Sequence, residues 1–340
     1  MKTTNDLFKL VLLAFAALLI VSSGCKKEGC TDPLATNYDE KAKKDDGSCT
    51  YDVVIDPYEE MTTYMAGNNL DLDDMITNWT ITASDLNTAG TSNYYIIDLR
   101  ADTAYTRGHI AGAVNTTLAN IVTQAGSCGG KPIVVVCYTG QSAAHGVVAL
   151  RLSGYSDAMI LKFGMSSWNG DFDSWTLNTG DAAVGNGNWS TTNTIVSNVA
   201  FSLPSFTSTK TTGAEILAER VDYMLTGGFK GVAIIDILGT PSNYFINNYW
   251  ASTDVDQYGN ITGAHRIKED LTLDADGFKY LDPDETIVTY CWTGQTSSAV
   301  TAYLTVLGYD AKSLKFGANG MIYAQLTSFK WTGSGSYPVE

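Results

Sequence analysis

Two halves of this 340-residue chain repeat the same succession of short motifs. In each half a run of apolar, mostly β-branched residues ends in a cysteine, and Thr-Gly-Gln begins two positions later. The two cysteines, Cys137 and Cys291, lie 154 positions apart. A Gly-Tyr pair and a Phe-Gly pair then follow, at 154–155 and 163–164 in the first half and at 308–309 and 316–317 in the second. Self-similarity of this period indicates a tandem duplication, so the chain is constrained to fold as two copies of one architecture.

Each half alternates short β-branched runs with helical stretches. This pattern is typical of an α/β fold in which helices flank a mainly parallel sheet. Residues 142–152 and 296–307 are predicted helices, rich in Ala, Val and Leu. We expect them to stop at Gly154 and Gly308, because glycine readily adopts the left-handed conformation that ends a helix.

The domain boundaries follow from composition. Residues 179–194 are rich in Gly, Asn, Ser and Thr, which predicts a linker between the halves. We therefore place one domain at 53–178, the linker at 179–200 and a second domain at 201–340. Within these domains, the β-branched runs that end in Asp98 and Asp236 are predicted to be equivalent strands.

Both cysteines are predicted to end a buried strand just before a helix. In open α/β folds this position lies at the carboxyl edge of the sheet, where ligands bind. Backbone N–H groups and the dipole at the start of the following helix stabilise a negative charge there, which favours a thiolate or a persulfide. Cys137 and Cys291 are therefore the candidate nucleophiles.

With these motifs the chain resembles the rhodanese family. The first half carries Asp98, Arg100 and a Gly-His-Ile-Ala-Gly-Ala signature that contains His109. The second half repeats the signature with Asn260 in place of the histidine, and it has no arginine after Asp236. The resemblance covers both halves, approximately residues 60–175 and 212–330.

This resemblance implies two tandem rhodanese-like domains with sulfurtransferase activity. A cysteine would take sulfane sulfur from a donor such as thiosulfate, hold it as a persulfide and pass it to cyanide or a thiol, with ping-pong kinetics. By carry-over both Cys137 and Cys291 react, with a preference for Cys137, whose half has the fuller signature. The loop amides that cradle the outer sulfur are those of Tyr138, Thr139, Gly140, Gln141, Ser142, Trp292, Thr293, Gly294, Gln295 and Thr296. Supporting, mainly structural roles fall to Asp98, Arg100, His109 and Asp236.

Both loops depart from the family at one position. Many rhodanese loops carry an arginine five residues after the cysteine, where this chain has Ser142 and Thr296. Without that cation the loop holds an anionic donor less firmly, and a cysteine phosphatase would lack the arginine that binds phosphate. Two other functions remain open: a non-catalytic binding module, and a carrier of sulfane sulfur at the cell envelope.

The first 24 residues are interpreted as an export signal. Twelve apolar residues at 10–21 are too few to span a bilayer, which takes about 20, and are typical of a signal-peptide core. Residues 21–25, Val-Ser-Ser-Gly-Cys, resemble a bacterial lipobox, which implies lipidation of Cys25. We therefore expect a lipoprotein of the bacterial cell envelope, held at the periplasmic face or the outer surface by its acyl chains. The alternative is an ordinary secretory signal, with Cys25 as a free thiol.

Residues 25–52 are predicted to form a tether between this anchor and the domains. Residues 30–51 look like the short Cys-Thr-Asp-Pro modules of exported bacterial proteins. The resemblance pairs Cys30 with Cys49 in a disulfide, which an exported protein can keep and which contributes about 3 kcal/mol. The spacing of its oxygen-bearing side chains does not match an EF-hand, and we expect solvated turns rather than a calcium site. These side chains are Asp32, Asn37, Asp39, Asp45 and Asp46.

The composition excludes several function classes. Hydrophobic residues make up 44% of the chain and charged ones 17%, which is enough to build cores and excludes extensive disorder. A net charge of -15 argues against nucleic acid or an anionic membrane surface as a partner, because phosphate binding uses clustered Lys and Arg. With only three histidines we expect no metal centre and no cofactor. Cys128 has no function assigned.

Overall fold

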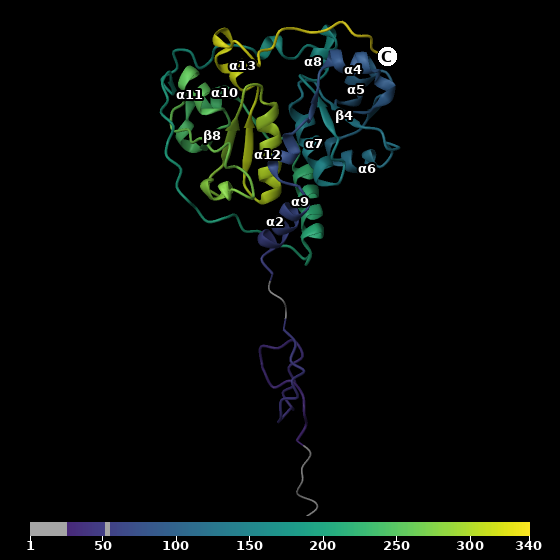
Figure 1. Ribbon diagram of the computed structural model, residues 1–340, viewed down its shortest axis with the longest axis vertical. Coiled ribbons are helices and arrows are strands. Elements are labelled where there is room, and N and C mark those ends of the chain that lie inside the picture. The colour runs from purple at the N-terminus through teal and green to yellow at the C-terminus, as the bar shows by residue number, and fades with distance from the viewer. Residues whose placement is uncertain (1–25, 52–54) are drawn as a thin grey trace, which may run out of the picture. The chain divides into compact units, whose positions relative to one another are not determined.

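The structure is a computed structural model, and it describes residues 26–51 and 55–340. The chain divides into a small unit that ends at Ile55 and a large unit, Asp56–Glu340 (Figure 1). The predicted signal peptide, 1–24, and the predicted lipidation site, Cys25, lie outside the described residues. In the part of the chain that is described, no helix is both long and apolar enough to cross a bilayer.

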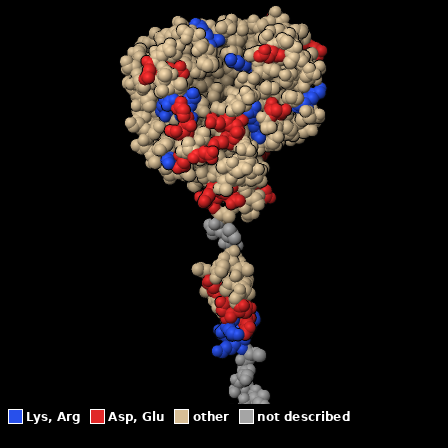
Figure 2. Space-filling view, in the orientation of Figure 1, with Lys and Arg blue, Asp and Glu red and all other residues tan. Residues whose placement is uncertain are grey.

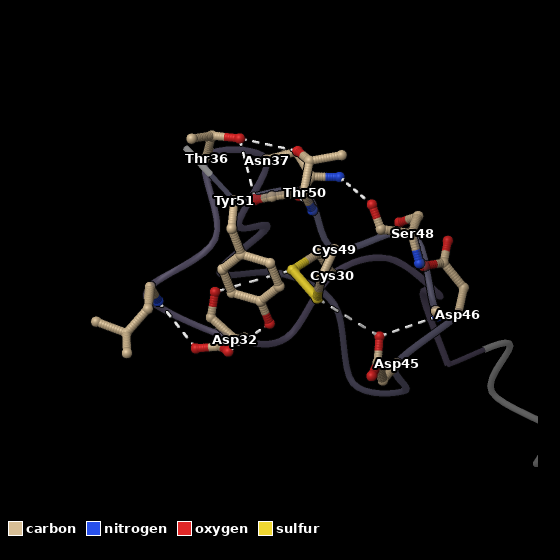
Figure 3. The surroundings of a disulfide bond; sticks show 12 residues. Cys30, Asp32, Thr36, Asn37, Asp45, Asp46, Ser48, Cys49, Thr50 and Tyr51 are labelled. Carbon is tan, nitrogen blue, oxygen red and sulfur yellow. Dashed lines mark hydrogen bonds between the residues drawn. A yellow bond between two sulfur atoms is a disulfide. The ribbon is translucent and has the colours of Figure 1, made fainter. Parts of the chain in front are cut away.

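The small unit is a series of turns closed by a disulfide between Cys30 and Cys49 (Figure 3). Asp32 accepts hydrogen bonds from the Tyr51 hydroxyl at 2.7 Å and from the Leu34 amide at 2.9 Å. Three other carboxylates accept from an amide two residues later, as short Asx turns do; they belong to Asp39, Asp45 and Asp46. These carboxylates therefore serve local turns, and the described residues hold no group of three acidic, His or Cys side chains placed to bind a metal.

The first half of the large unit is built on a five-stranded parallel sheet of order β1-β5-β4-β2-β3. Its strands are β1 (Thr80–Ile81), β2 (Tyr95–Asp98), β3 (Val114–Asn115), β4 (Ile133–Val136) and β5 (Met159–Leu161). Its helices are α2 (Pro57–Gly67), α3 (Leu72–Ile76), α4 (Ala83–Ala89), α5 (Asp102–Arg107), α6 (Ile121–Ala125), α7 (Gln141–Leu152) and α8 (Met165–Trp168), with the 3₁₀ helices η1 (Thr91–Asn93), η2 (Leu118–Asn120), η3 (Gly170–Phe172) and η4 (Thr176–Asn178). Every residue of the central strand β4 is buried, as in a parallel sheet covered on both faces.

The second half repeats this plan with a parallel sheet of order β7-β11-β10-β8. The strands are β7 (Gly231–Val232), β8 (Phe245–Asn248), β10 (Ile287–Tyr290) and β11 (Ala311–Leu314), and β6 (Trp189–Ser190) pairs antiparallel with β9 (Asn260–Ile261). The helices are α9 (Gly213–Gly227), α10 (Ile234–Gly239), α11 (Ser252–Tyr258), α12 (Gln295–Leu307) and α13 (Ala318–Met321), with the 3₁₀ helices η5 (Pro241–Asn243), η6 (Gly277–Tyr280) and η7 (Tyr323–Gln325). The predicted α/β class, with parallel sheets flanked by helices, is confirmed.

Helices α7 and α12 follow the two cysteines and correspond to the predicted helices 142–152 and 296–307. Glycines end both helices: Gly154 has φ +96° and Gly308 has φ +107°. The two helices pack against each other in the middle of the large unit (Figure 1). The helices that begin at the cysteine loops therefore form the contact between the halves.

One predicted strand is wrong. The run that ends in Asp236 is not equivalent to β2: only its first residue, Val232, lies in the edge strand β7, and Asp236 is exposed on α10. The true counterpart of β2 is β8, which pairs with β10 as β2 pairs with β4. Apolarity is misleading here, because Ile235 is 71% exposed whereas Asn247 in β8 is fully buried. Asn247 tolerates burial because it exchanges two hydrogen bonds with the Ile267 backbone.

Each half ends in a segment that packs against the other half. The segment predicted as a linker supplies β6 to the second half, where the Ala183 amide also donates to the Met321 carbonyl at 2.9 Å. The C-terminal segment returns to the first half, where Glu340 and His109 exchange backbone hydrogen bonds of 2.9 and 3.0 Å. This exchange ties the halves into one compact unit.

His145, on α7, is buried at the contact between the halves. Neither ring nitrogen has a hydrogen-bond partner among the described residues, and the ring packs edge-on against Phe229, with centroids 5.2 Å apart. Burial, helped by the nearby charge of Lys230, lowers the pKa of His145 to about 3. The folded state therefore accommodates only the neutral imidazole above that pH.

Acid should destabilise the wild type more than a His145→Leu variant. The unfolded chain binds a proton at His145 below pH 6.5, but the folded state does not until about pH 3. Stability is therefore lost as the pH falls below 6.5, by about 2 kcal/mol at pH 5, and is unaffected above pH 7. Urea unfolding of both proteins at pH 7 and pH 5 gives the loss of unfolding free energy in each. The carboxylates titrate in both proteins, so the difference between the two losses is due to His145. Equal losses would contradict the prediction.

Candidate active site

Both candidate nucleophiles lie at the carboxyl edge of a parallel sheet. Cys137 directly follows β4 and Cys291 directly follows β10. Gly140 and Gly294 precede α7 and α12 with φ of 81° and 75°, a left-handed conformation that turns the chain sharply from strand to helix. The two cysteines are 5% and 3% exposed. The sulfurs thus lie between a strand end and a helix start in both halves.

The two sulfurs have different partners. Cys137 Sγ accepts a hydrogen bond from the Gly140 amide at 3.1 Å. Cys291 Sγ accepts one from the Ser297 amide at 3.2 Å, and its thiol donates to Ser297 Oγ at 3.5 Å. The Ser297 hydroxyl is also hydrogen-bonded to that of Ser313 at 2.8 Å. Cys291 therefore has a hydroxyl and an amide beside it.

Sequence reasoning missed this serine pair. Ser297 lies one residue beyond the predicted loop, and the equivalent position in the first half, six residues after the cysteine, is Ala143. Ser313 comes from β11, a neighbouring strand, and nothing in the local motif points to it. The only signal of this pair in the sequence is that the equivalent positions of the two repeats differ, with Ala143 in the first half and Ser297 in the second.

The Phe-Gly loops fix the backbone of the cysteines. The Met165 amide donates to the Cys137 carbonyl at 2.8 Å, and the Ala318 amide donates to the Cys291 carbonyl at 3.0 Å. A side chain on the preceding glycine of either loop, Gly317 for example, would collide with the cysteine carbonyl. The repeated Phe-Gly motif is therefore a close backbone contact beneath each cysteine.

Two glutamines connect each cysteine loop to the opposite half. Gln141 Oε1 accepts a hydrogen bond from the Phe316 amide at 3.0 Å, and Gln295 Oε1 accepts one from the Phe163 amide at 2.9 Å. All four residues are repeat equivalents, so the bonds are related by the pseudo-symmetry of the duplication. Each glutamine holds the Phe-Gly loop that contacts the cysteine of the other half.

Aromatic rings close the same interface. Trp175 and Trp331 stack with centroids 5.9 Å apart. Phe163 packs against Trp331 at 5.3 Å, and Phe316 packs against Trp175 at 5.1 Å, both edge-on. The glutamine bonds are therefore enclosed by apolar contacts, where a hydrogen bond is less exposed to competition from water.

The supporting residues of the first half make structural contacts, with Asp98 and Arg100 buried and His109 half-buried. Asp98 and Arg100 make an ion pair of 2.6 Å, and Arg100 also donates to the Gly108 carbonyl at 2.7 Å. The His109 ring stacks on Tyr105, and its Nδ1 lies 3.0 Å from the Tyr105 carbonyl oxygen. These contacts fix the loops around the sheet edge.

The second half replaces the ion pair with aromatic stacking. Asn248 and Trp250 occupy the positions of Asp98 and Arg100, and Asn248 Oδ1 accepts from the Trp250 amide at 3.0 Å. The Trp250 ring stacks on Trp292, next to Cys291, with centroids 4.5 Å apart. The residue beside Cys291 is therefore held by an indole ring rather than by a guanidinium.

The other predicted loop residues have varied surroundings. Arg100 lies over the Tyr138 ring at 5.4 Å, and Thr139 accepts a hydrogen bond from Gln141 at 3.1 Å. Ser142 is half-buried on α7, and Thr293 is buried. Trp292 and Thr296 line a cavity. Among all predicted loop residues, only Gly140 makes a hydrogen bond to its cysteine sulfur in the described part of the chain.

That cavity opens beside Cys291 and has a volume of about 500 Å³. Both halves contribute to its wall, which consists of Asp73, Ile76, Trp79, Tyr249, Lys268, Glu269, Cys291, Trp292, Thr296 and Phe329. An adjoining cavity of about 190 Å³ shares part of this wall and adds Lys162. Most of the wall comes from segments remote from Cys291 in sequence, so sequence reasoning missed it.

Tyr249 brings a phenol to the same cavity. It is 6% exposed and takes the position that Leu99 has in the first half. Burial raises the pKa of Tyr249, and the negative charges of Asp73 and Glu269 raise it further. The phenol therefore stays protonated and is available as a hydrogen-bond donor beside Cys291.

Comparison with known proteins places both halves in one family. The family model of the Rhodanese-like domain matches residues 82–171 and 219–322. Thiosulfate sulfurtransferase GlpE of Shewanella oneidensis is 36% identical over 77 residues, which cover 22% of this chain and 74% of that protein. YibN of Escherichia coli is 31% identical over 80 residues, 22% of this chain and 56% of that protein. Among solved structures, the 3-mercaptopyruvate sulfotransferase SseA from Escherichia coli is 17% identical, covering 71% of this chain and 99% of that one with a TM-score of 0.28.

The two glutamines predict a crossed effect of mutation. In Gln141→Ala the Phe316 amide loses its acceptor, so its hydrogen exchange should accelerate while that of the Phe163 amide stays slow. Gln295→Ala should do the reverse, which makes each variant the control for the other. Loss of the hydrogen bond to a partly buried amide should also lower the free energy of unfolding by about 1 kcal/mol in either variant. Hydrogen exchange followed by mass spectrometry tests the pattern, and faster exchange at both amides in both variants would contradict it.

Proposed function

The chain belongs to the rhodanese-like family, with one family domain in each half, and from this premise we propose that it transfers sulfane sulfur through a cysteine persulfide. A relative named as a thiosulfate sulfurtransferase supports an activity of this type. We assign the reaction first to Cys291, with a small sulfur compound such as thiosulfate as donor and cyanide or a thiol as acceptor. The observation that carries this assignment is the cavity that opens at Cys291.

The reaction consists of two displacements at sulfur. The Cys291 thiolate attacks the outer sulfur of thiosulfate, the S–S bond of the donor breaks, and sulfite leaves with the electron pair. Cyanide or a thiolate then attacks the outer sulfur of the persulfide, and the electron pair of the broken bond returns to Cys291 Sγ. Splitting the transfer in this way predicts ping-pong kinetics.

The contacts of Cys291 suit both displacements. The Ser297 amide lies 3.2 Å from the sulfur and stabilises a negative charge on it. The Ser297 hydroxyl can turn to donate a hydrogen bond once the thiol has lost its proton, since a hydroxyl is both donor and acceptor. The backbone of Cys291 is held by the Ala318 amide, so the sulfur keeps its place during the transfer.

The loop itself offers no cation to an anionic donor, because Thr296 stands at the fifth position after Cys291. Lys268 lines the cavity and is the only basic side chain to do so within the described residues. It comes from the segment that follows the second Gly-Ala signature, not from the loop. We assign Lys268 the electrostatic role that an arginine has in many rhodanese loops.

Substitution of the two cysteines tests the assignment. Cys291→Ser should abolish thiocyanate formation from thiosulfate and cyanide, because serine cannot form a persulfide. Cys137→Ser is the matched control and should keep most of the activity. Intact-protein mass spectrometry after donor treatment should show a 32 Da addition that disappears in Cys291→Ser. If the wild type shows no turnover and no persulfide with several donors, the proposed function is wrong. Loss of activity only in Cys137→Ser would assign the reaction to the first half instead.

We further propose that the protein is anchored to the cell envelope by lipid on Cys25. The support is the sequence alone: a twelve-residue apolar core followed by Val-Ser-Ser-Gly-Cys. Residues 25–52 would then act as the tether that carries the disulfide-closed module.

Metabolic labelling tests the anchor. Radiolabelled palmitate should enter the wild type and fractionate with membranes. A Cys25→Ser variant should take up no label, because serine has no sulfur with which to form the thioether to diacylglycerol. Labelling of Cys25→Ser, or an unlabelled wild type in the soluble fraction, would contradict the proposal.

A further inference from the structure

The cavity at Cys291 is larger than an inorganic donor or cyanide requires. Its volume of about 500 Å³ falls in the range of about 300 to 1,000 Å³ that is typical of sites for small organic molecules. Residues from both halves line it, so its contents are selected by the whole large unit. The size indicates that at least one of the two substrates is an organic sulfur compound.

The cavity wall carries charges of both signs. Lys268 supplies a positive charge, and Asp73 and Glu269 supply negative ones. Glu269 is already paired with Arg266. Asp73 is exposed on α3 and makes no ion pair within the described residues, so its carboxylate is available to a ligand. Figure 2 shows one face of the large unit, on which acidic side chains gather near the middle. A purely anionic organic substrate would be repelled by Asp73, and a purely cationic one would be repelled by Lys268.

Aromatic rings form the rest of the wall. Trp292 stacks between Trp250 and Phe329, with centroids 4.5 and 5.6 Å apart, and Trp79 comes from the first half. Phe329 also lines the cavity and is 55% exposed, so part of its ring is open to a ligand. Aromatic faces attract ammonium groups as well as apolar stems.

We propose that the thiol acceptor at Cys291 is zwitterionic, an amino-acid-type thiol whose carboxylate pairs with Lys268 and whose ammonium lies between Asp73 and the aromatic wall. This inference rests on the proposed function and specifies its second step. The acceptor thiolate attacks the outer sulfur of the Cys291 persulfide and becomes an organic persulfide. The S–S bond to Cys291 breaks, and its electron pair restores the Cys291 thiolate.

Three thiols of similar size separate the charge contributions: cysteine as zwitterion, cysteamine as cation and 3-mercaptopropionate as anion. KM for each is measured on the full chain with thiosulfate as donor. In Asp73→Asn, KM should rise about fivefold for cysteine and cysteamine and not for 3-mercaptopropionate. In Lys268→Gln it should rise about fivefold for cysteine and 3-mercaptopropionate and not for cysteamine. Ratios of variant to wild type cancel the different reactivities of the thiols.

Asp222→Asn is the matched control, because Asp222 is exposed on α9 outside the cavity wall. It should leave all three KM values unchanged. Equal effects on the three thiols in Asp73→Asn or Lys268→Gln, or no effect at all, would overturn the inference. Thiocyanate formation from cyanide by the wild type is measured in parallel. If thiocyanate forms but the KM of the thiols does not depend on their charge, only the zwitterionic acceptor is refuted. If neither thiocyanate nor an organic persulfide forms with any acceptor, the proposed function is refuted.

Discussion

The reciprocal bonds of Gln141 and Gln295 set the spacing on which the rest of the site depends. Each glutamine lies against the glycine that precedes its counterpart, so that a side chain at Gly140 would collide with Gln295, and one at Gly294 with Gln141. The Gly-Gln pair is therefore self-complementary across the interface, as in a two-fold symmetric contact between subunits. Because each Phe-Gly loop also holds the cysteine carbonyl of its own half, a shift of either loop would disturb both that cysteine and the glutamine of the other half.

Within this symmetric frame the two halves have become chemically different. The first half keeps a buried Asp98–Arg100 ion pair, and the second places Asn248 and Trp250 at those positions. The Arg100 guanidinium is held by Asp98 and the Gly108 carbonyl, whereas the Trp250 ring stacks on Trp292, which lines the cavity at Cys291. The serine at position 297 adds a hydroxyl that alanine cannot supply in the first half. Identical motifs around the cysteines thus conceal unequal sites.

The sequence could predict what is local and could not predict what the chain assembles from afar. The placement of the cysteines between strand and helix follows from β-branched runs and helix-ending glycines, which are short-range signals. Asp236 was misplaced because apolarity alone cannot tell a buried strand from a helix whose Ile235 faces solvent. The polar composition of β8 conceals the correct strand, because Asn247 is buried through hydrogen bonds to Ile267, 20 residues away. Lys268 and Asp73 meet at Cys291 only after both halves fold, so no spacing in the sequence indicates them.

The acidic chain and its arginine-free loops are consistent with a site of this kind. A loop arginine would bring a fixed positive charge next to the sulfur and select anions regardless of their shape. Lys268 instead lies in a separate segment on the cavity wall, which also carries carboxylates and aromatic rings that an inorganic anion cannot use. Selectivity then depends on the joint position of several groups, and those groups come from both copies of the repeat. The second copy alone would hold the cysteine and its amides but would lack Asp73, Ile76 and Trp79 of the wall, which gives the fusion of two domains a physical reason to persist.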